Sequence, residues 1–176
     1  MAFKNRERSE WVLSRLSLHE VDRVLEIGFG SGADVKRAAG RAGHVTGIDP
    51  SQVMLNQARR RNRTAVDAGR VELRLGAMPM LPFGRECFTK AFSINSFQFW
   101  PDKTAGLCEL SRVMTPGGVV AIAEQPRNSG ATDDTARRTG DEIAHALTAA
   151  GFRDVQVAFR KMKPESTACA IATNRG

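Results

Sequence analysis

The stretch VLEIGFGSGADV, residues 24–35, joins an apolar run to a predicted helix through three alternate glycines, Gly28, Gly30 and Gly32. Glycine takes left-handed conformations without steric cost, so such a turn lets the backbone pass close to a ligand. The free amides at the start of the next helix then point toward that ligand. Asp49 ends the following predicted strand, where a carboxylate can accept hydrogen bonds from the hydroxyls of a ribose. Together these residues predict a site for an adenosine-containing molecule.

The glycine turn alone leaves two cofactor classes open. The letters GFGSGA also satisfy the looser dinucleotide pattern G-x-G-x-x-A. A two-domain nicotinamide dehydrogenase needs a second domain, for which 176 residues leave no room. The single-domain short-chain kind relies on a catalytic tyrosine, and the sequence has none. We therefore expect a different adenosine cofactor, with a nicotinamide-dependent oxidoreductase as the alternative.

Strand and helix patterns alternate along the chain, which predicts crossover connections and a parallel sheet with helices on both faces. Strands are expected over residues 21–27, 44–49, 70–75, 87–94 and 119–124. Helices are expected over 5–17, from 31 to about 40 or 43, 51–61 and 133–150, and in a segment with Leu107, Leu110, Val113 and Met114 on one side that stops at Pro116, Gly117 and Gly118.

The last two predicted strands, 153–159 and 166–173, break this rhythm. The connection between them is RKMKPE, which is too short for a parallel crossover. They are therefore expected to form an antiparallel hairpin. The sequence predicts an α/β fold with a mostly parallel, seven-stranded sheet that ends in an antiparallel C-terminal strand.

Composition excludes several classes of protein. No apolar stretch approaches the roughly 18 residues of a membrane span, and the charged N-terminus lacks the apolar core of a secretory signal. A cytoplasmic protein without membrane contact is expected. Cys87, Cys108 and Cys169 lack the paired spacing of a metal site, so no metal is expected and the three thiols are predicted to be reduced core residues.

The net charge of +7 comes mostly from arginine, which is densest at Arg59, Arg60, Arg61 and Arg63. Such a run can bind the phosphates of RNA. It is more often the solvated face of a helix. A non-enzymatic RNA-binding or regulatory module therefore stays as a second alternative, although no separate RNA-binding domain is visible.

Several motifs in order resemble the class I S-adenosylmethionine-dependent methyltransferases, specifically the small-molecule type also seen among ubiquinone-biosynthesis enzymes. The resemblance covers residues 21–173, and its motifs are VLEIGFGSG (24–32), GIDPS (47–51), LPF (81–83), FSINSFQFWPD (92–102) and ELSRVMTPGG (109–118). It implies a Rossmann-like, doubly wound fold, with residues 1–176 as a single methyltransferase domain: an N-terminal helix in 1–20 and the core in 21–176. It also implies S-adenosyl-L-methionine as cofactor and a small or medium organic acceptor.

The resemblance also implies which residues hold the cofactor. Glu26, Gly28, Gly30 and Gly32 would surround the methionine part, Asp49 would hold the ribose, Pro50, Met54, Ala77 and Met78 would enclose the adenine, and Ile94 and Asn95 would offer backbone groups to the methionine end. One departure concerns the third loop, where Ala77 and Met78 stand in place of the acidic residue that many relatives use. Adenine is then expected to be held by backbone donors and apolar contact.

The sequence assigns no catalytic residue. His19 and His44 belong to the edge opposite the ligand site and His145 lies mid-helix, so none suits a general base. Glu124 is a carboxylate at the correct edge, although a plain strand terminus explains it as well. A sulfonium cofactor is already an activated methyl donor, so alignment for in-line attack can suffice.

The aromatic loop NSFQFWPD has two interpretations. Phe97, Phe99 and Trp100 either form a wall for the acceptor or pack the next helix on the sheet. No lid is evident, because a short segment connects the last parallel strand to its helix. The open site predicts a large acceptor or closure by a second subunit, as in a homodimer.

Overall fold

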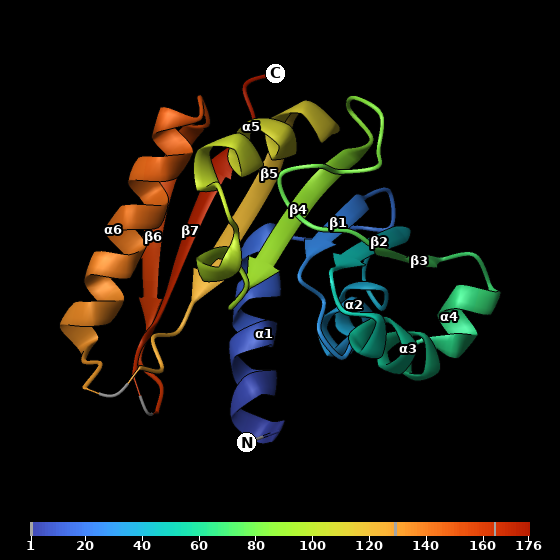
Figure 1. Ribbon diagram of the computed structural model, residues 1–176, viewed down its shortest axis with the longest axis horizontal. Helices are drawn as coiled ribbons and strands as arrows, with labels where there is room; N and C mark the ends of the chain where they lie inside the picture. The colour runs from blue at the N-terminus through green and yellow to red at the C-terminus, as the bar shows by residue number, and fades with distance from the viewer. Residues whose placement is uncertain (1, 129, 164) are drawn as a thin grey trace.

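The computed structural model describes residues 2–128, 130–163 and 165–176, and Figure 1 shows a seven-stranded sheet in the order β3-β2-β1-β4-β5-β7-β6. The strands are β1 (Arg23–Ile27), β2 (His44–Asp49), β3 (Val71–Leu75), β4 (Phe88–Ile94), β5 (Met114–Glu124), β6 (Arg153–Arg160) and β7 (Thr167–Thr173). The first five are parallel, and β7 lies antiparallel between β5 and β6. The predicted fold class and the antiparallel hairpin are confirmed.

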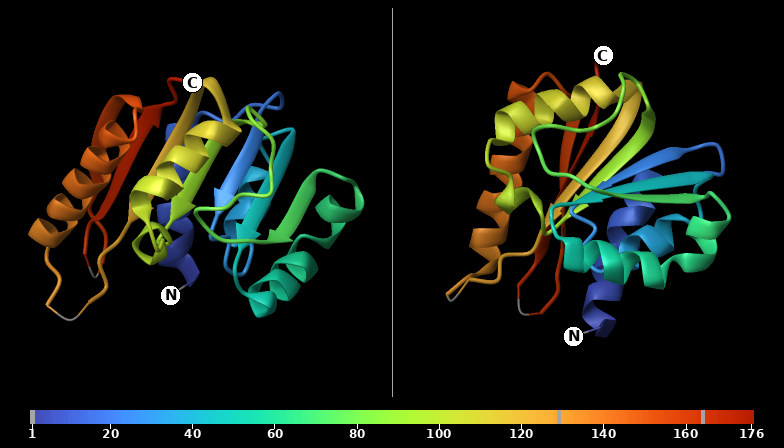
Figure 2. Two further views of the ribbon diagram at one scale, coloured as in Figure 1. Left: turned by 45° about the horizontal axis from the view of Figure 1, so that its top comes forward. Right: turned by 45° about the vertical axis from the view of Figure 1, so that its right-hand side comes forward.

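Helices cover both faces of the sheet (Figure 2). They are α1 (Ala2–Leu16), α2 (Ala33–Ala38), α3 (Gln52–Arg61), α4 (Arg63–Asp67), α5 (Lys103–Val113) and α6 (Asp133–Ala149), with a 3-10 turn η1 (Phe97–Phe99). Apolar side chains of α1, α2 and α3 belong to the core cluster on one face. Those of α5 and α6 belong to the cluster on the other.

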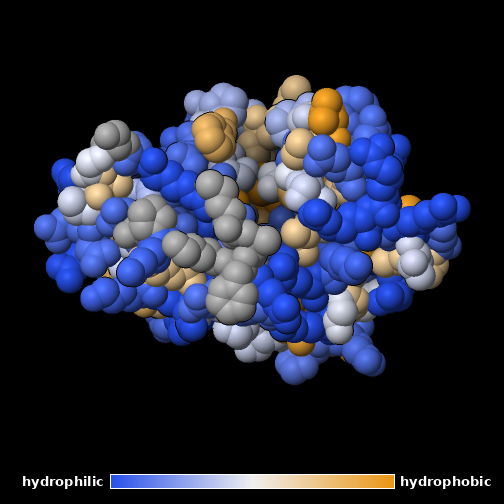
Figure 3. All heavy atoms as spheres, turned by 90° about the horizontal axis from the view of Figure 1, so that it is seen from below, coloured by the Kyte–Doolittle hydropathy of each residue, from blue (hydrophilic) through white to orange (hydrophobic). Residues whose placement is uncertain are grey.

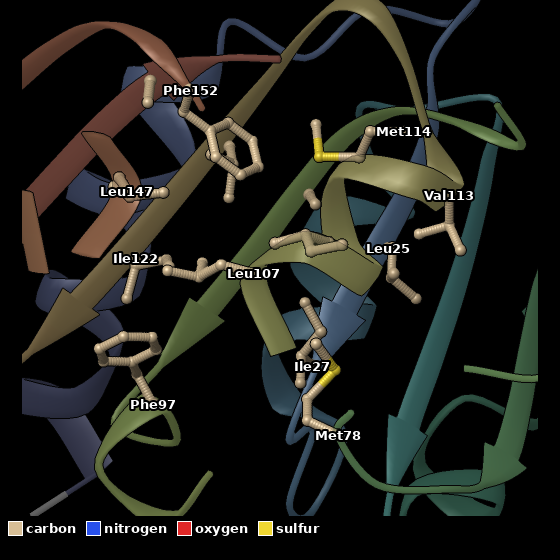
Figure 4. Packing of buried hydrophobic residues seen from close by; sticks show 14 of the residues in the cluster. Leu25, Ile27, Met78, Phe97, Leu107, Val113, Met114, Ile122, Leu147 and Phe152 are labelled. Carbon is tan, nitrogen blue, oxygen red and sulfur yellow. The ribbon is translucent and has the colours of Figure 1, made fainter. Parts of the chain in front are cut away.

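The second cluster is shown in Figure 4, where Leu107 of α5 points toward the sheet between Ile122 of β5 and Leu25 of β1. Leu107 and Ile122 are fully buried. Phe97 and Met78 come from loops at the carboxyl ends of strands and join the same cluster. The loops that border the ligand edge are therefore anchored in the core.

The prediction for residues 113–118 was wrong about where the helix ends. Helix α5 ends at Val113, and Met114 already belongs to β5, where it pairs with Phe88. Gly117 has a φ of +76°, and the register between β4 and β5 shifts between Phe88 and Lys90. The turn residues after Met114 thus form an irregularity inside a long strand, because β4 supplies a pairing partner on both sides of it.

The expectation that all three cysteines lie in the core was also wrong. All three are free thiols, but only Cys169 is buried, while Cys87 is half-buried and Cys108 is exposed on α5. Cys169 lies on β7 between β5 and β6. Burial raises the pKa of its thiol to about 12.

The carboxyl ends of the parallel strands share one edge of the sheet, as chain direction requires. The first turns of α1 extend past the arrowheads of β4 and β5 at this edge (Figure 1). The N-terminal helix therefore forms one side of the region where ligands bind in open parallel sheets. Within the described residues, no helix is both long and apolar enough to cross a membrane.

We predict that Asn174 locks the end of β7 to the junction of α5 and β5. Its fully buried Nδ2 lies 3.0 Å from the carbonyl oxygens of Ser111 and Met114, and its Oδ1 accepts a 2.6 Å hydrogen bond from Ser111 Oγ. Asn174→Ala should lower the free energy of unfolding by about 1–3 kcal/mol, because buried carbonyls lose their donor. Urea denaturation measures this change. Arg175→Ala, at an exposed neighbour, is the control, and equal midpoints for the two variants would contradict the prediction.

Candidate functional site

The glycine turn after β1 takes its shape from three left-handed residues. Gly28, Gly30 and Gly32 have φ values of +78°, +50° and +73°. A Cβ atom on Gly28 would lie 2.1 Å from Ser96 Oγ, and one on Gly32 would lie 2.6 Å from the Ala58 Cβ. A Cβ on Gly30 would meet no such atom within 4 Å. Packing explains the outer two glycines, whereas the middle one faces open space that a ligand can enter.

Asp49 fastens this turn to the end of β2. Its Oδ2 accepts a 2.9 Å hydrogen bond from the Gly30 amide, and its Oδ1 accepts one of 2.9 Å from the Ser51 amide. Ser51 itself caps α3, through its hydroxyl and the Met54 amide. Each carboxylate oxygen carries two lone pairs, so both oxygens of Asp49 keep acceptor capacity for further donors.

Glu26 supplies a second carboxyl group at the same edge. The residue is only 2% exposed, and its Oε2 has no hydrogen-bond partner among the described residues. Burial raises the pKa of this carboxyl well above its usual value, and the nearby Asp34 and Asp49 raise it further. A bound cation would offset both effects. The orphaned oxygen therefore fits the ammonium of an amino-acid moiety.

A small cavity of about 70 Å³ lies between the glycine turn and the loops after β2 and β3. Gly28, Pro50, Ala77 and Met78 all line it, together with Ser96 and Phe99. Ligand pockets usually exceed about 300 Å³, so this cavity can hold only part of a cofactor. The structure thus brings four of the expected adenine and glycine-turn residues together.

Met54 does not join them. It is half-buried, packs against the core cluster that includes Leu55 and Ala58 of α3, and does not line the cavity. Met78 is 5% exposed and has both roles, because it lines the cavity and belongs to the core.

Asn95 connects the ends of β4 and β5. It has a left-handed backbone with φ of +55°. Its amide donates to the Ala123 carbonyl at 2.8 Å, and its Oδ1 accepts a 2.8 Å hydrogen bond from the Gln125 amide. Ile94, the residue before it, is 9% exposed. These two hydrogen bonds tie the end of β4 to the end of β5.

The aromatic loop divides between the two interpretations. Phe97 and Trp100 are buried and meet edge to face, with ring centroids 4.9 Å apart. They pack η1 and α5 on the sheet. Phe99 is 76% exposed and lines the small cavity together with Trp100, whereas Phe97 lines a different hollow, at the end of β5.

A second hollow, of about 370 Å³, lies beyond the end of β5 and against α6. Glu124 lines it, is 4% exposed, and accepts a 3.2 Å hydrogen bond from the Gln98 amide. Burial raises the pKa of Glu124 to about 7, although hydrogen bonds from Gln98 and Phe97 and the charges of Arg8 and Lys103 act in the opposite direction. This carboxyl can therefore exchange a proton near neutral pH.

Arg8 of α1 is a buried residue of this edge that the sequence analysis missed. It is 6% exposed, and its Nη1 donates to Gln125 Oε1 at 2.9 Å. It precedes Val12 by one helical turn and so shares the buried face of α1. That position on an otherwise apolar face was the signal that could have revealed it.

Other candidates lie away from the site. His44 begins β2 and His19 lies before β1, both at the opposite edge, and His145 lies within α6. In the described part of the chain, no group of three histidine, cysteine or acidic side chains could hold a metal ion. Figure 3 looks onto the ligand edge, where apolar atoms are visible within a recess bordered by mostly hydrophilic residues.

Known proteins share both sequence and fold with this chain. Residues 25–122 match the methyltransferase domain family. The chain is 33% identical over 174 residues to the uncharacterized methyltransferase YdaC of Bacillus subtilis, which covers 98% of this chain and 94% of that protein. It is also 33% identical over 161 residues to the arsenite methyltransferase of Halobacterium salinarum, covering 83% of this chain and 40% of that protein.

Solved structures agree on the fold. A S-adenosylmethionine-dependent methyltransferase from Aquifex aeolicus superposes with a TM-score of 0.77 at 22% identity, over 94% of this chain and 89% of that one. Phosphoethanolamine N-methyltransferase 2 of Haemonchus contortus, in complex with S-adenosyl-L-methionine, gives a TM-score of 0.78 at 19% identity, over 97% of this chain and 53% of that one. With the family match and the relative from Bacillus, these findings confirm the resemblance seen in the sequence: the chain belongs to the class I S-adenosylmethionine-dependent methyltransferases.

Proposed function

We propose that this methyltransferase holds its cofactor across the ends of β1, β2, β3 and β4 and methylates a small or medium-sized organic molecule. The observation that carries the placement is the turn at Gly30, whose amide is fixed by Asp49 while the space beside its Cα stays open. When bound, S-adenosylmethionine supplies an activated methyl group on a sulfonium. The chain has to bind, orient and shield the reactants.

Each part of the cofactor has candidate partners in the chain. The carboxyl of Glu26 suits the ammonium, and the remaining lone pairs of Asp49 suit the ribose hydroxyls. Gly28 and Gly32 keep the turn tight around Gly30. The cavity residues Pro50, Ala77 and Met78 suit the adenine, and Met54, which packs in α3 outside this cavity, stays a predicted adenine contact. Ile94 and Asn95 stay predicted contacts of the methionine end.

The hollow at Glu124 is the proposed acceptor site. Its volume of about 370 Å³ falls within the range of pockets for small organic ligands. Apolar walls from Phe97, Pro126 and Ile143 face the hydroxyls of Thr135 and Thr139. Glu124 is placed to accept a proton from an acceptor hydroxyl or amine at this site.

The remaining expectations stay predictions. These are one domain over residues 1–176, a cytoplasmic location and a homodimer. Binding to RNA gains no support, because Arg61 donates to the Ser31 carbonyl at 3.0 Å rather than standing free, while Arg59 and Arg60 are exposed on α3 as expected of a solvated helix face. The nicotinamide alternative is excluded by the family of the chain.

Calorimetric titration with S-adenosylhomocysteine tests the proposed function. The wild-type protein should bind it, and Asp49→Ala should bind it more weakly by about 1.5–3 kcal/mol, the value of a charge-assisted hydrogen bond. A screen of organic acceptors that detects released S-adenosylhomocysteine then defines the substrate. Absence of binding by the folded wild-type protein would refute the proposal.

Gly30→Val should abolish cofactor binding while the fold persists, because the new side chain enters space that the structure leaves open. The matched control is Gly69→Val, since Gly69 also has a positive φ, +70°, with nothing within 4 Å of an added Cβ, but lies in the turn before β3. Both variants carry a similar backbone penalty. Only the first should lose affinity for S-adenosylhomocysteine by calorimetry. Equal affinities in the two variants would place the cofactor elsewhere.

The free energy of unfolding of Glu124→Gln, relative to that of wild type, should be higher at pH 8 than at pH 5. The folded-state pKa of Glu124 is raised from 4.5 to about 7, so the folded state binds the proton more tightly than the unfolded state does. Wild-type stability from this group is present below pH 4.5 and is lost as the pH rises to 7. The difference between variant and wild type should therefore grow by up to about 3 kcal/mol over that interval.

Urea denaturation at both pH values measures this difference. Glu142→Gln, an exposed carboxyl that lines the same hollow, is the matched control. A difference between Glu124→Gln and wild type that does not change with pH would contradict the prediction.

A further inference from the structure

Arg8 is a buried cation that forms no ion pair within 4.0 Å among the described residues, although the charges of Asp34 and Glu124 lie near enough to oppose the lowering of its pKa by burial. Its Nη1 donates to Gln125 Oε1 at 2.9 Å and its Nη2 to Asn5 Oδ1 at 3.2 Å, and both acceptors are neutral amide oxygens. Its Nε is buried and has no partner among the described residues. Arginine is almost never fully buried without a partner charge, since desolvation of an ion costs several kcal/mol. The unpartnered Nε is therefore a donor that a bound anion could use.

Three other arginines near this place are already engaged, and Arg6, which lines the same hollow, is exposed. Arg37 pairs with Asp34 at 2.7 Å and lies 3.6 Å from Glu10. Arg61 is held by Ser31. Arg127 is exposed and donates to Asn5 at 3.2 Å. Among the described arginines that line this hollow, Arg8 is the buried one, and its Nε is a donor without a partner.

Arg8 lies beside the glycine turn. It lines a hollow of about 630 Å³ together with Phe29 and Ser31 of the turn and Ala33 and Asp34 at the start of α2. An anion in this hollow would lie beside the Arg8 guanidinium and next to the glycine turn.

Hydrogen bonds also connect Arg8 to the expected position of the methionine end. Asn95 at the tip of β4 accepts from the Gln125 amide, and the Gln125 side chain accepts from Arg8. The Gln125 Nε2 is fixed on the Glu165 carbonyl at 2.7 Å, which orients its oxygen toward Arg8. The guanidinium is therefore held in place before any ligand arrives.

We infer that Arg8 binds the carboxylate of the cofactor's methionine moiety, which makes it a binding residue contributed by the N-terminal helix. This inference rests on the proposed function, because it assumes the cofactor at the glycine turn. The methionine moiety is a zwitterion, and the edge offers it two buried groups of opposite character, the carboxyl of Glu26 and the guanidinium of Arg8. Arginine suits the second role because its fork of donors matches a carboxylate.

The test compares three ligands by calorimetry at one pH. S-adenosylhomocysteine carries the carboxylate, its decarboxylated analogue keeps the ammonium only, and 5′-methylthioadenosine lacks the amino acid. The proteins are wild type, Arg8→Gln, Arg8→Lys and the control Arg15→Gln. Arg15 is an exposed arginine in the last turn of the same helix, so its substitution removes the same charge away from the hollow.

Arg8→Gln should weaken binding of S-adenosylhomocysteine by about 10- to 100-fold, the range for a hydrogen bond to a charged group. Its affinity for the two ligands without a carboxylate should stay within about twofold of wild type, as for sites that do not interact. Arg8→Lys should fall between, because it keeps the charge and loses the fork. Arg15→Gln should match wild type for all three ligands.

Other outcomes overturn the inference. Equal weakening of all three ligands would make Arg8 a structural residue, and thermal unfolding of each variant identifies loss of the fold. If Arg8→Gln bound all three ligands as tightly as wild type, Arg8 would not contact the cofactor carboxylate. Its guanidinium would then be free for another anion, such as a carboxylate on the methyl acceptor. Failure of wild type to bind S-adenosylhomocysteine would refute the proposed function itself, which separates the two results.

Discussion

The hydrogen bond between the Gly30 amide and Asp49 Oδ2 is the contact on which the ligand edge depends. It joins the turn after β1 to the tip of β2, and the second oxygen of Asp49 fixes the start of α3 through Ser51. One carboxylate thereby sets the relative position of two strand ends and one helix. We expect the ribose beside the same oxygens. The carboxylate of Asp49 therefore both stabilises the turn and is proposed to bind the ribose hydroxyls. The turn is therefore already ordered before a cofactor binds at this place.

Buried ionisable groups gather along the same edge. Glu26, Glu124 and Arg8 are each at most 6% exposed, and each keeps a hydrogen-bonding atom or a shifted pKa that the folded chain does not neutralise. Buried ionisable groups destabilise a fold. They concentrate at functional sites because binding and catalysis need such charges. Their order along the sheet follows the ligand that we propose: a carboxyl for an ammonium, a guanidinium for a carboxylate, and a titrating carboxyl at the acceptor hollow.

The helices on one face of the sheet anchor the aromatic loop, and the N-terminal helix on the other face borders the proposed cofactor site. Helices α5 and α6 bury the core that includes Leu107 and Ile122 and hold the aromatic loop through Phe97. Helix α1 packs on the other face and extends past the strand tips, where Arg8 projects from its buried side. The expectation of an open site is thus modified by a helix that flanks the edge, although no described segment closes over it.

The sequence by itself determined the alternation of strands and helices, the terminal hairpin, the glycine turn and the place of Asp49, because each follows from spacing within a short segment. The tertiary structure decided what depends on partners far along the chain. Met114 became a strand residue because Phe88 pairs with it, and Met54 faces the core rather than the cavity. Arg8 became a buried cation only when Gln125 came within reach, and local periodicity cannot encode contacts at that separation.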